Sequence, residues 1–187
     1  MFLTTKRLLL REFEENDWQA LLAYQRDPLY LRYNPWHQRT EEDVRQFVQR
    51  FMIWSQEKPR RKFQFVIVLQ AEQRVIGNGG IRLKTAQSWE ADLGYELDSR
   101  YWNQGYATEA AQTLLRFGFE ELRLHRIWAH CISENTRSAH VMEKIGMRRE
   151  GWFRENEWMK NRWWDTYQYA ILDHEWQKRQ AEFNKVR

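Results

Sequence analysis

Cysteine, proline and long apolar runs are all scarce in this chain of 187 residues. It contains a single cysteine, Cys131, and only three prolines. One cysteine excludes an intramolecular disulfide, so a reducing compartment is expected. No stretch reaches the roughly 18 apolar residues that a membrane-spanning helix requires. The first seven residues lack the apolar core and small-residue cleavage site of a signal peptide. We therefore predict a cytoplasmic protein without a membrane segment.

Charge of one sign is also not concentrated anywhere. The formal net charge is +4, but Lys and Arg alternate with Asp and Glu, and the densest basic run, 58–62, is short. Nucleic-acid binding requires basic residues clustered on one face, so no nucleic-acid partner is expected. A mildly positive surface also suits a polyanionic cofactor. The eleven tryptophans either pack the core and surface or form an aromatic-walled pocket.

The apolar periodicity predicts alternating strands and helices in the order β-α-α-β-β-β-α-β-α-β-β-α. Asn16 and Thr40 are expected to cap the first two helices. Residues 78–80, Asn-Gly-Gly, interrupt a strand, but no helix follows them, so a bulge or close packing is expected rather than a phosphate loop. This order predicts one domain over residues 1–187, of mixed α/β (α+β) class, with helices on both faces of a mixed sheet.

Residues 94–110 combine the end of a strand, a short loop and the start of a helix. The first N–H groups of a helix point outward and carry partial positive charge, which makes them a site for an anion such as pyrophosphate. Gly105 would allow the backbone to approach the phosphates, and Ala107 would keep the second close position small. A simple helix start without a ligand would show the same pattern. In a second segment, Asn135 ends a strand just before a helix, where Asn also serves as an ordinary cap.

Together the two segments resemble the GNAT acetyltransferase superfamily, most closely its ribosomal-protein-alanine N-acetyltransferase branch. The loop motif Q/R-x-x-G-x-G/A corresponds here to Trp102-Asn103-Gln104-Gly105-Tyr106-Ala107. Further matching stretches are Thr108-Glu109-Ala110, Glu134 to Ser138, Glu143 to Met147, Glu150-Gly151 and the opening Thr5 to Arg11. Two residues depart from the pattern: Trp102 replaces the Gln or Arg of the motif, and Asn103 stands where this branch often has Gly.

This resemblance implies a mostly antiparallel sheet of about seven strands, splayed at the fourth strand, with the pantetheine arm of acetyl-CoA in the gap. It implies an N-acetyltransferase, without a metal, in which a primary amine attacks the thioester directly. The acceptor would be a protein N-terminal amine or a small amine. The residues expected to bind the cofactor are Leu97, Asn103, Gln104, Gly105, Tyr106, Ala107, Thr108, Asn135 and Ser138.

The resemblance also implies that Asn135 positions the cofactor arm and that Ser138 reaches its sulfur. A base must take the proton of the amine. Glu96 and Asp92 alternate onto one face of their strand, and we expect Glu96 ahead of Asp92 in this role. His130 lies on the strand across the expected cleft and is a further candidate. Each of the three could instead be an ordinary polar group, with water as the base.

The sequence also bears on one alternative function, on the role of Cys131 and on the oligomeric state. A catalytically silent acetyl-CoA-binding module would keep Gly105, Ala107 and Asn135 but would not turn over an amine. Cys131 is expected to be a small buried strand residue rather than an acyl carrier. A homodimer could form through the C-terminal helix, which carries Trp176 and Phe183.

Overall fold

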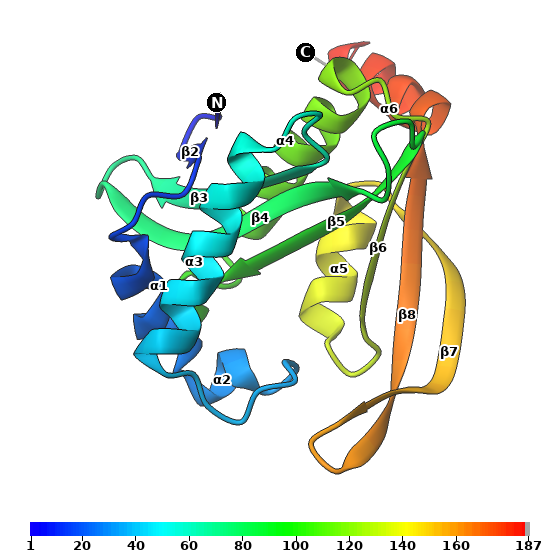
Figure 1. The fold of residues 1–187 in the computed structure, drawn as a ribbon. Helices are drawn as coiled ribbons and strands as arrows, with labels where there is room; N and C mark the ends of the chain where they lie inside the picture. The colour runs from blue at the N-terminus through cyan, green and yellow to red at the C-terminus, as the bar shows by residue number, and fades with distance from the viewer. Residues whose placement is uncertain (186–187) are drawn as a thin grey trace.

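An eight-stranded sheet organises the part of the chain that the computed structural model describes, residues 1–185 (Figure 1). The strands are β1 (Phe2–Thr4), β2 (Leu8–Arg11), β3 (Lys62–Leu69), β4 (Arg74–Leu83), β5 (Glu90–Leu97), β6 (Arg126–Ile132), β7 (Arg148–Met159) and β8 (Arg162–Leu172). The helices are α1 (Asp17–Gln25), α2 (Pro28–Leu31), α3 (Glu41–Gln56), α4 (Tyr106–Arg116), α5 (Thr136–Lys144) and α6 (Asp173–Lys185), with short turns η1 (Ser99–Tyr101) and η2 (Phe117–Glu121). No helix among the described residues has the length and apolar character needed to cross a membrane.

The sheet is antiparallel at every pairing except one. Its strand order is β1-β2-β3-β4-β5-β6-β8-β7, and only β5 and β6 are parallel. These two strands pair over just three positions, Glu90–Asp92 against Arg126–Trp128. From Leu93 onward β5 no longer pairs with β6, so the sheet opens between them. The predicted splay at this strand is confirmed, and the mostly antiparallel mixed sheet with it. One strand more than expected is present, because Phe2–Thr4 pairs with β2.

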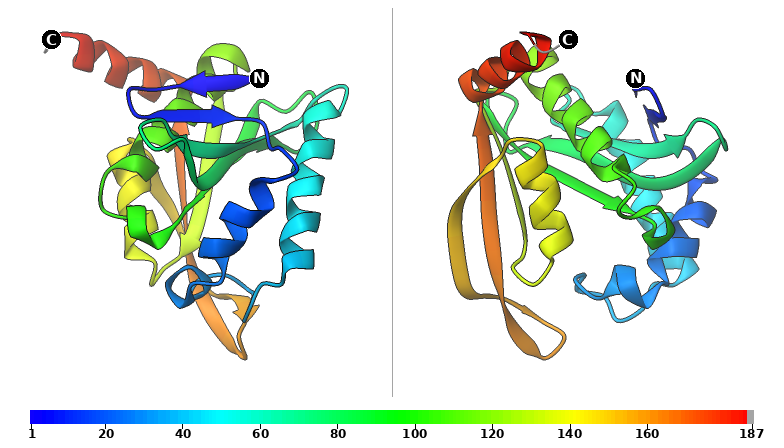
Figure 2. Two further views of the ribbon diagram at one scale, coloured as in Figure 1. Left: turned by 90° about the vertical axis from the view of Figure 1, so that its left-hand side faces the viewer. Right: turned by 180° about the vertical axis from the view of Figure 1, so that it is seen from behind.

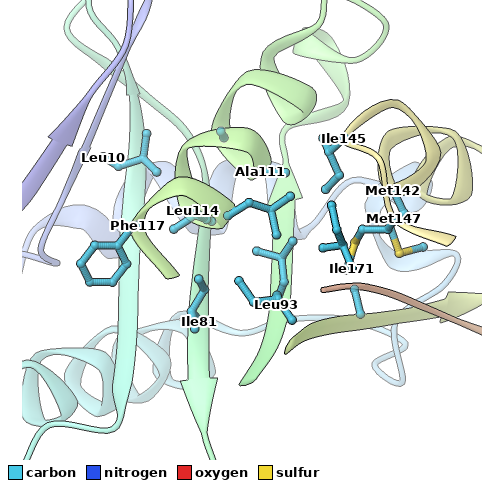
Figure 3. Close-up of a cluster of buried hydrophobic side chains, with 14 of the residues drawn as sticks. Leu10, Ile81, Leu93, Ala111, Leu114, Phe117, Met142, Ile145, Met147 and Ile171 are labelled. Atoms are coloured by element: carbon cyan, nitrogen blue, oxygen red, sulfur yellow. The ribbon is translucent and has the colours of Figure 1, made fainter. Parts of the chain in front are cut away.

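Helices cover both faces of the sheet, as expected (Figure 2). On one face, α4 and α5 bury a large apolar cluster. Ala111 and Leu114 of α4 point toward Ile81 and Leu93 of the sheet, and Met142 and Ile145 of α5 lie in the same cluster (Figure 3). On the other face, α1, α2 and α3 pack on β3 through a second cluster that includes Leu21, Val44, Val48, Val66 and Val68. Helices on both faces therefore bury β3 from Phe63 to Leu69.

Local capping differs between the first helices. The predicted cap of α3 is confirmed: the Thr40 hydroxyl accepts a hydrogen bond from Asp43 N, while the Asp43 carboxylate accepts one from Thr40 N. The expected side-chain cap at Asn16 is wrong, because Asn16 itself has α-helical backbone angles and makes no cap hydrogen bond. The short helix α2 was not predicted. Its start has an ordinary signal, since Pro28 is the first residue and Asp27 accepts from Leu29 N.

The Asn-Gly-Gly stretch of β4 is a region of close packing, as predicted. A Cβ on Gly80 would overlap the carbonyl oxygen of Phe63 on the neighbouring strand. Asn78 is 3% exposed and lies opposite Glu96 of β5. The stretch therefore holds three strands close together and places one buried amide among them.

The end of the β7–β8 hairpin contacts the segment that contains α2. Lys160 donates hydrogen bonds to the carbonyl oxygens of Leu31 and Arg32, and Tyr33 packs edge-on against Trp164 with ring centroids 6.1 Å apart. These contacts bring the N-terminal helices to the hairpin across the open side of the sheet. Trp176 of α6 is buried in its own chain and stacks on Phe119. The side chain of Phe183 lies outside the described residues.

Candidate active site

A cavity of about 920 Å³ lies where β5 and β6 part. Its walls come from the end of β5, the loop into α4, the end of β6 and the inner side of α5. The segment from Leu29 to Pro35 and the hairpin residues Glu157 to Met159 border it as well. The cavity thus connects the start of α4 with the region bounded by α2 and the hairpin.

The loop before α4 has an unusual backbone. Asn103 and Gly105 both have left-handed conformations, with φ of 61° and 81°. Asn adopts this conformation more readily than other residues with a Cβ, which explains why Asn103 can stand where the related branch often has Gly. Gly105 is the N-cap of α4 and has no side chain to bond the first-turn amides. These amides, at Tyr106, Ala107 and Thr108, have no acceptor within the helix and border the cavity.

Arg7 and Glu109 fix the position of this loop. Arg7 donates to the Gln104 carbonyl oxygen at 3.0 Å and to the Glu109 carboxylate at 2.6 Å, and its guanidinium lies 4.3 Å from the centre of the Tyr106 ring. Burial raises the pKa of Glu109, but hydrogen bonds from Thr5 and Arg7 outweigh it, so the net pKa is lowered. The Gln104 side chain donates to the Arg100 carbonyl oxygen and does not line the cavity.

The start of α5 forms the opposite wall. Asn135 is its N-cap, and its side-chain oxygen accepts from Ser138 N at 3.2 Å. The Ser138 hydroxyl lies 3.2 Å from the Tyr95 hydroxyl, which reaches it from β5. Burial raises the pKa of Tyr95 well above its usual range, so this phenol stays protonated at neutral pH. Strand β5 and helix α5 are therefore bridged by a pair of hydroxyl groups beside the cavity.

Sequence reasoning missed three basic residues of α5 that line the cavity: Arg137, His140 and Lys144. Their spacing of three and four residues places them along one side of the helix. That spacing was visible in the sequence. The guanidinium of Arg137 also lies 5.2 Å from the centre of the Trp102 ring. Arg137 and Lys144 put positive charge on the wall that faces the start of α4, and His140 adds a polar ring between them.

Trp102, the other departure from the family motif, has a clear structural contact. Its indole N–H donates to the Leu97 carbonyl oxygen at 2.9 Å. Leu97 itself is 5% exposed and lines the cavity at the end of β5. Trp102 thereby holds the segment that follows η1 against the end of β5.

Glu96 projects from the face of β5 opposite to that of Tyr95 and Leu97, and it is surrounded by hydrogen-bond donors. Its Oε1 atom accepts from the Tyr24 hydroxyl at 2.7 Å, from Gln25 Nε2 at 2.8 Å and from Asn78 Nδ2 at 2.6 Å. Its Oε2 atom accepts from the Tyr30 hydroxyl at 2.8 Å. Glu96 and Tyr30 line the cavity, whereas the three partners of Oε1 lie behind them. Burial, followed by the neighbouring negative charge of Glu96, raises the pKa values of Tyr24 and Tyr30.

Asp92 is placed differently from Glu96, although both lie on the same strand. It accepts from Arg82 Nε at 2.8 Å and forms an ion pair with that residue. It also lies opposite Trp128, where β5 and β6 are still paired, and it does not line the cavity. His130 does line the cavity, is exposed, and stacks on Trp128 with ring centroids 6.0 Å apart.

Cys131 lines the cavity from β6 and is 7% exposed. Burial raises the pKa of its thiol to about 11, partly offset by a hydrogen bond with the Ser138 side chain. Since thiolates, not thiols, react with alkylating agents, the reactivity of Cys131 near pH 7 should be low.

We expect Cys131 to react with iodoacetamide at pH 7 roughly 100-fold more slowly than a free cysteine, because a pKa of about 11 leaves about 100-fold less thiolate than an ordinary value of 9.0. Mass spectrometry of the intact protein over time would measure the rate. The urea-unfolded protein provides the control, in which the rate should return to that of free cysteine. Rapid labelling of the folded protein would contradict the assignment of Cys131 as an inert wall residue.

Comparison with known proteins places this arrangement in one family. The family model described as acetyltransferase (GNAT) domain matches residues 7–148. The chain is 44% identical over 176 residues to YnaD of Bacillus subtilis (strain 168), an uncharacterized N-acetyltransferase, covering 94% of this chain and 99% of that one. A crystal structure of a GNAT-family acetyltransferase from Bacillus anthracis superimposes with a TM-score of 0.83 at 41% identity, covering 93% and 99% of the two chains. The present chain is also 25% identical to the [ribosomal protein uS5]-alanine N-acetyltransferase of Escherichia coli (strain K12), over 93% of this chain and 92% of that one.

The chain therefore belongs to the GNAT acetyltransferase family and is an N-acetyltransferase. Its relatives include ribosomal-protein-alanine N-acetyltransferases and N-acetyltransferases from Bacillus. Among the described residues, no group of three or more His, Cys, Asp or Glu side chains could hold a metal ion.

Proposed function

We propose that this enzyme transfers the acetyl group of acetyl-CoA to a primary amine that approaches Glu96 from the side of α2 and the hairpin. One observation carries the proposal: a single cavity joins the exposed amides of α4 to a carboxylate held by four donors. Solved structures of similar fold support the choice of cosubstrate. RimL, a ribosomal L7/L12 α-N-protein acetyltransferase, was solved in complex with coenzyme A, and the microcin C7 self-immunity acetyltransferase MccE with acetyl-CoA and AMP.

The cofactor end of the cavity fits a polyanion. The pyrophosphate is received by the first-turn amides of α4, beside the left-handed Gly105. Arg137 and Lys144 provide positive charge from α5 for the remaining phosphate. Asn103 to Thr108 supply mostly backbone groups, so the side-chain departures at Trp102 and Asn103 are tolerated. The pantetheine arm lies in the gap between β5 and β6, near Leu97 and Asn135.

The chemistry then needs one group on each side of the thioester. Glu96 receives the proton of the amine, directly or through water, so that an uncharged nitrogen attacks the carbonyl carbon. As the C–S bond breaks, the departing thiolate accepts a hydrogen bond from the Ser138 hydroxyl, which is paired with the protonated Tyr95, and it takes up the second proton that the nitrogen loses as the amide forms. His130 and Asp92 are not needed for these steps. His130 remains a candidate for contact with the acceptor, since it lines the cavity.

The acceptor is a cationic amine, because Glu96 and Glu157 line the end of the cavity that remains for it. A protein N-terminal amine and a small amine both meet this description. Related folds act on both kinds: RimL is named for a ribosomal protein, and a spermidine N-acetyltransferase from Vibrio cholerae was solved with CoA and spermine. The segment 28–39 and the hairpin 152–166 provide the contacts that select between them.

Replacing Ser138 by Ala should lower kcat about tenfold while leaving the affinity for acetyl-CoA nearly unchanged. A contact with the departing thiolate is stronger in the transition state than in the ground state, so its loss affects turnover rather than binding. Steady-state kinetics on a working acceptor, with calorimetry for acetyl-CoA, would separate the two effects. The control is Ser133→Ala, since Ser133 lies on the same strand–helix connection but does not line the cavity. Equal kinetics for Ser138→Ala and the parent would remove Ser138 from the mechanism.

A further inference from the structure

A continuous chain of side-chain hydrogen bonds runs across three strands behind Glu96. Arg82 of β4 donates to Gln64 Oε1 at 3.1 Å, Gln64 Nε2 donates to Asn78 Oδ1 at 2.8 Å, and Asn78 Nδ2 donates to Glu96 Oε1 at 2.6 Å. Gln64 and Asn78 are 4% and 3% exposed. Buried amides arranged in this way are costly unless every polar atom is paired, so the chain is a specific feature and not incidental surface polarity.

The two ends of the chain set its direction. Arg82 can only donate hydrogen bonds, and an ionised carboxylate can only accept them. The amide groups of Gln64 and Asn78 must therefore be oriented with each NH₂ group directed toward Glu96. Asn78 cannot rotate its amide without losing both the bond from Gln64 and the bond to Glu96.

The two oxygens of Glu96 consequently have different roles. Oε1 receives three donors from behind, which is more than its two lone pairs fully accommodate. Among the residues that the structure describes, Oε2 receives one donor, the Tyr30 hydroxyl, and keeps a lone pair beside the cavity. The atom with spare capacity is thus the one next to the space where the amine must enter.

We propose that Asn78, held by Gln64 and Arg82, is a positioning residue that fixes Oε1 of Glu96 and so presents Oε2 to the acceptor amine. Tyr30 sets the orientation of Oε2 from the cavity side. This inference rests on the proposed role of Glu96 as the proton acceptor. It extends that role to residues on β3 and β4 that do not touch the reacting atoms, and to Tyr30 of α2, which contacts Oε2.

Other charged or titratable groups face Glu96 from the elements packed around it. Tyr24 and Tyr30 contact it directly, and Arg39 reaches it through Gln25, to which it donates at 3.2 Å. The Arg82–Asp92 pair lies at the far end of the amide chain. His130 on β6 and Glu157 on β7 line the same cavity. All of these remain unchanged in the variants below except Tyr30.

The test is the pH dependence of kcat/KM for Asn78→Asp and Asn78→Ala. In Asn78→Asp a second carboxylate replaces the amide beside Oε1, and two carboxylates this close share a proton, which raises the pKa at which the pair becomes fully ionised. The acid limb of the profile, where the rate falls as the pH is lowered, should therefore shift to higher pH by about one unit or more. Asn78→Ala removes one donor to the ionised form of Glu96, so it should shift the acid limb to higher pH by a smaller amount. It should also lower kcat about tenfold and leave the KM for acetyl-CoA unchanged.

Asn16→Asp adds the same charge at the distant end of α1 and should leave the acid limb where it is in the parent. A purely structural role for Asn78 would lower the folded fraction and the total rate without moving the limb. Coincident acid limbs for Asn78→Asp and the parent, in folded protein, would overturn the inference.

Tyr30→Phe keeps the buried ring and removes only the donor to Oε2, so it serves if the Asn78 variants do not fold. It should also move the acid limb to higher pH. Tyr169→Phe, which likewise removes a hydroxyl donor to a carboxylate, that of Glu143, outside the cavity lining, should not. An unmoved limb in Tyr30→Phe would count against the inference. If Glu96→Gln itself kept the parent's pH profile, the proposed role of Glu96 would fail, which is a result distinct from failure of the positioning role.

Discussion

Replacing Glu96 by Gln should lower kcat about 100-fold or more and remove the acid limb of the pH–rate profile. General-base catalysis contributes about 10²–10⁴-fold, and the amide of Gln cannot accept the proton. Amines are mostly protonated near neutral pH, so a rate that depends on deprotonation in the site must fall when the acceptor is lost. The KM for acetyl-CoA should change little, because the hydrogen-bond partners of Glu96 come from α1, α2 and β4 and not from the first turn of α4.

Asp92→Asn is the matched control for this prediction, since it makes the same chemical change four residues earlier on the same strand. Asp92 does not line the cavity, and in this variant Arg82 can still donate to Gln64, so the position of the acid limb should be that of the parent. Thermal unfolding of both variants would identify any loss of folded protein. If Glu96→Gln retained the parent's maximal rate and profile shape, water or another residue would have to act as the base.

Replacing Gly105 by Val should weaken acetyl-CoA binding by about tenfold or more, which corresponds to about 1.4 kcal/mol. The φ of Gly105 is 81°, a conformation that a β-branched residue adopts only with strain. The space around a new Cβ is not itself limiting, as its nearest neighbour would be the tip of Arg7 at 3.4 Å. The loss of affinity would therefore come from displacement of the loop and of the amides that follow it.

Asn103→Gly is the control for the loop, because Gly suits the φ of 61° at that position at least as well as Asn. Its affinity for acetyl-CoA should match that of the parent. Isothermal titration calorimetry would give both affinities, and circular dichroism would show that the variants are folded. An unchanged affinity in folded Gly105→Val protein would place the pyrophosphate elsewhere.

Much of the fold could be predicted because periodicity and turn residues act locally. Thr40 was recognised as a cap from its own side chain and the acidic residues after it, and the structure confirms it. Asn16 has the same kind of side chain, but its backbone angles are helical, so no cap bond forms. The strand Phe2–Thr4 could not be predicted from so few residues, since its existence depends on pairing with β2.

The cofactor loop and Glu96 could be proposed from the sequence, but the setting of Glu96 could not. Its donors come from Tyr24, Gln25, Tyr30 and Asn78, which are 18 to 72 residues away along the chain and meet only in the folded protein. Alternation along the strand put Asp92 and Glu96 on one face but could not separate their roles. They lie about 13 Å apart along the strand, and the sheet opens only beyond Asp92.

The central claim is that acetyl-CoA and a primary amine meet in the cavity between β5 and β6 and that Glu96 makes the amine reactive. The measurement that tests it most directly is release of free thiol from acetyl-CoA across a panel of amines. The panel would include peptides with free N-termini, polyamines and amino compounds, and mass spectrometry would identify the acetylated product. We predict acetyl transfer to at least one amine by the parent. Under the same conditions the rate with Glu96→Gln should be lower by about 100-fold or more. Tight binding of acetyl-CoA without transfer to any amine, as in a catalytically silent module, or equal rates for the two proteins, would contradict the account.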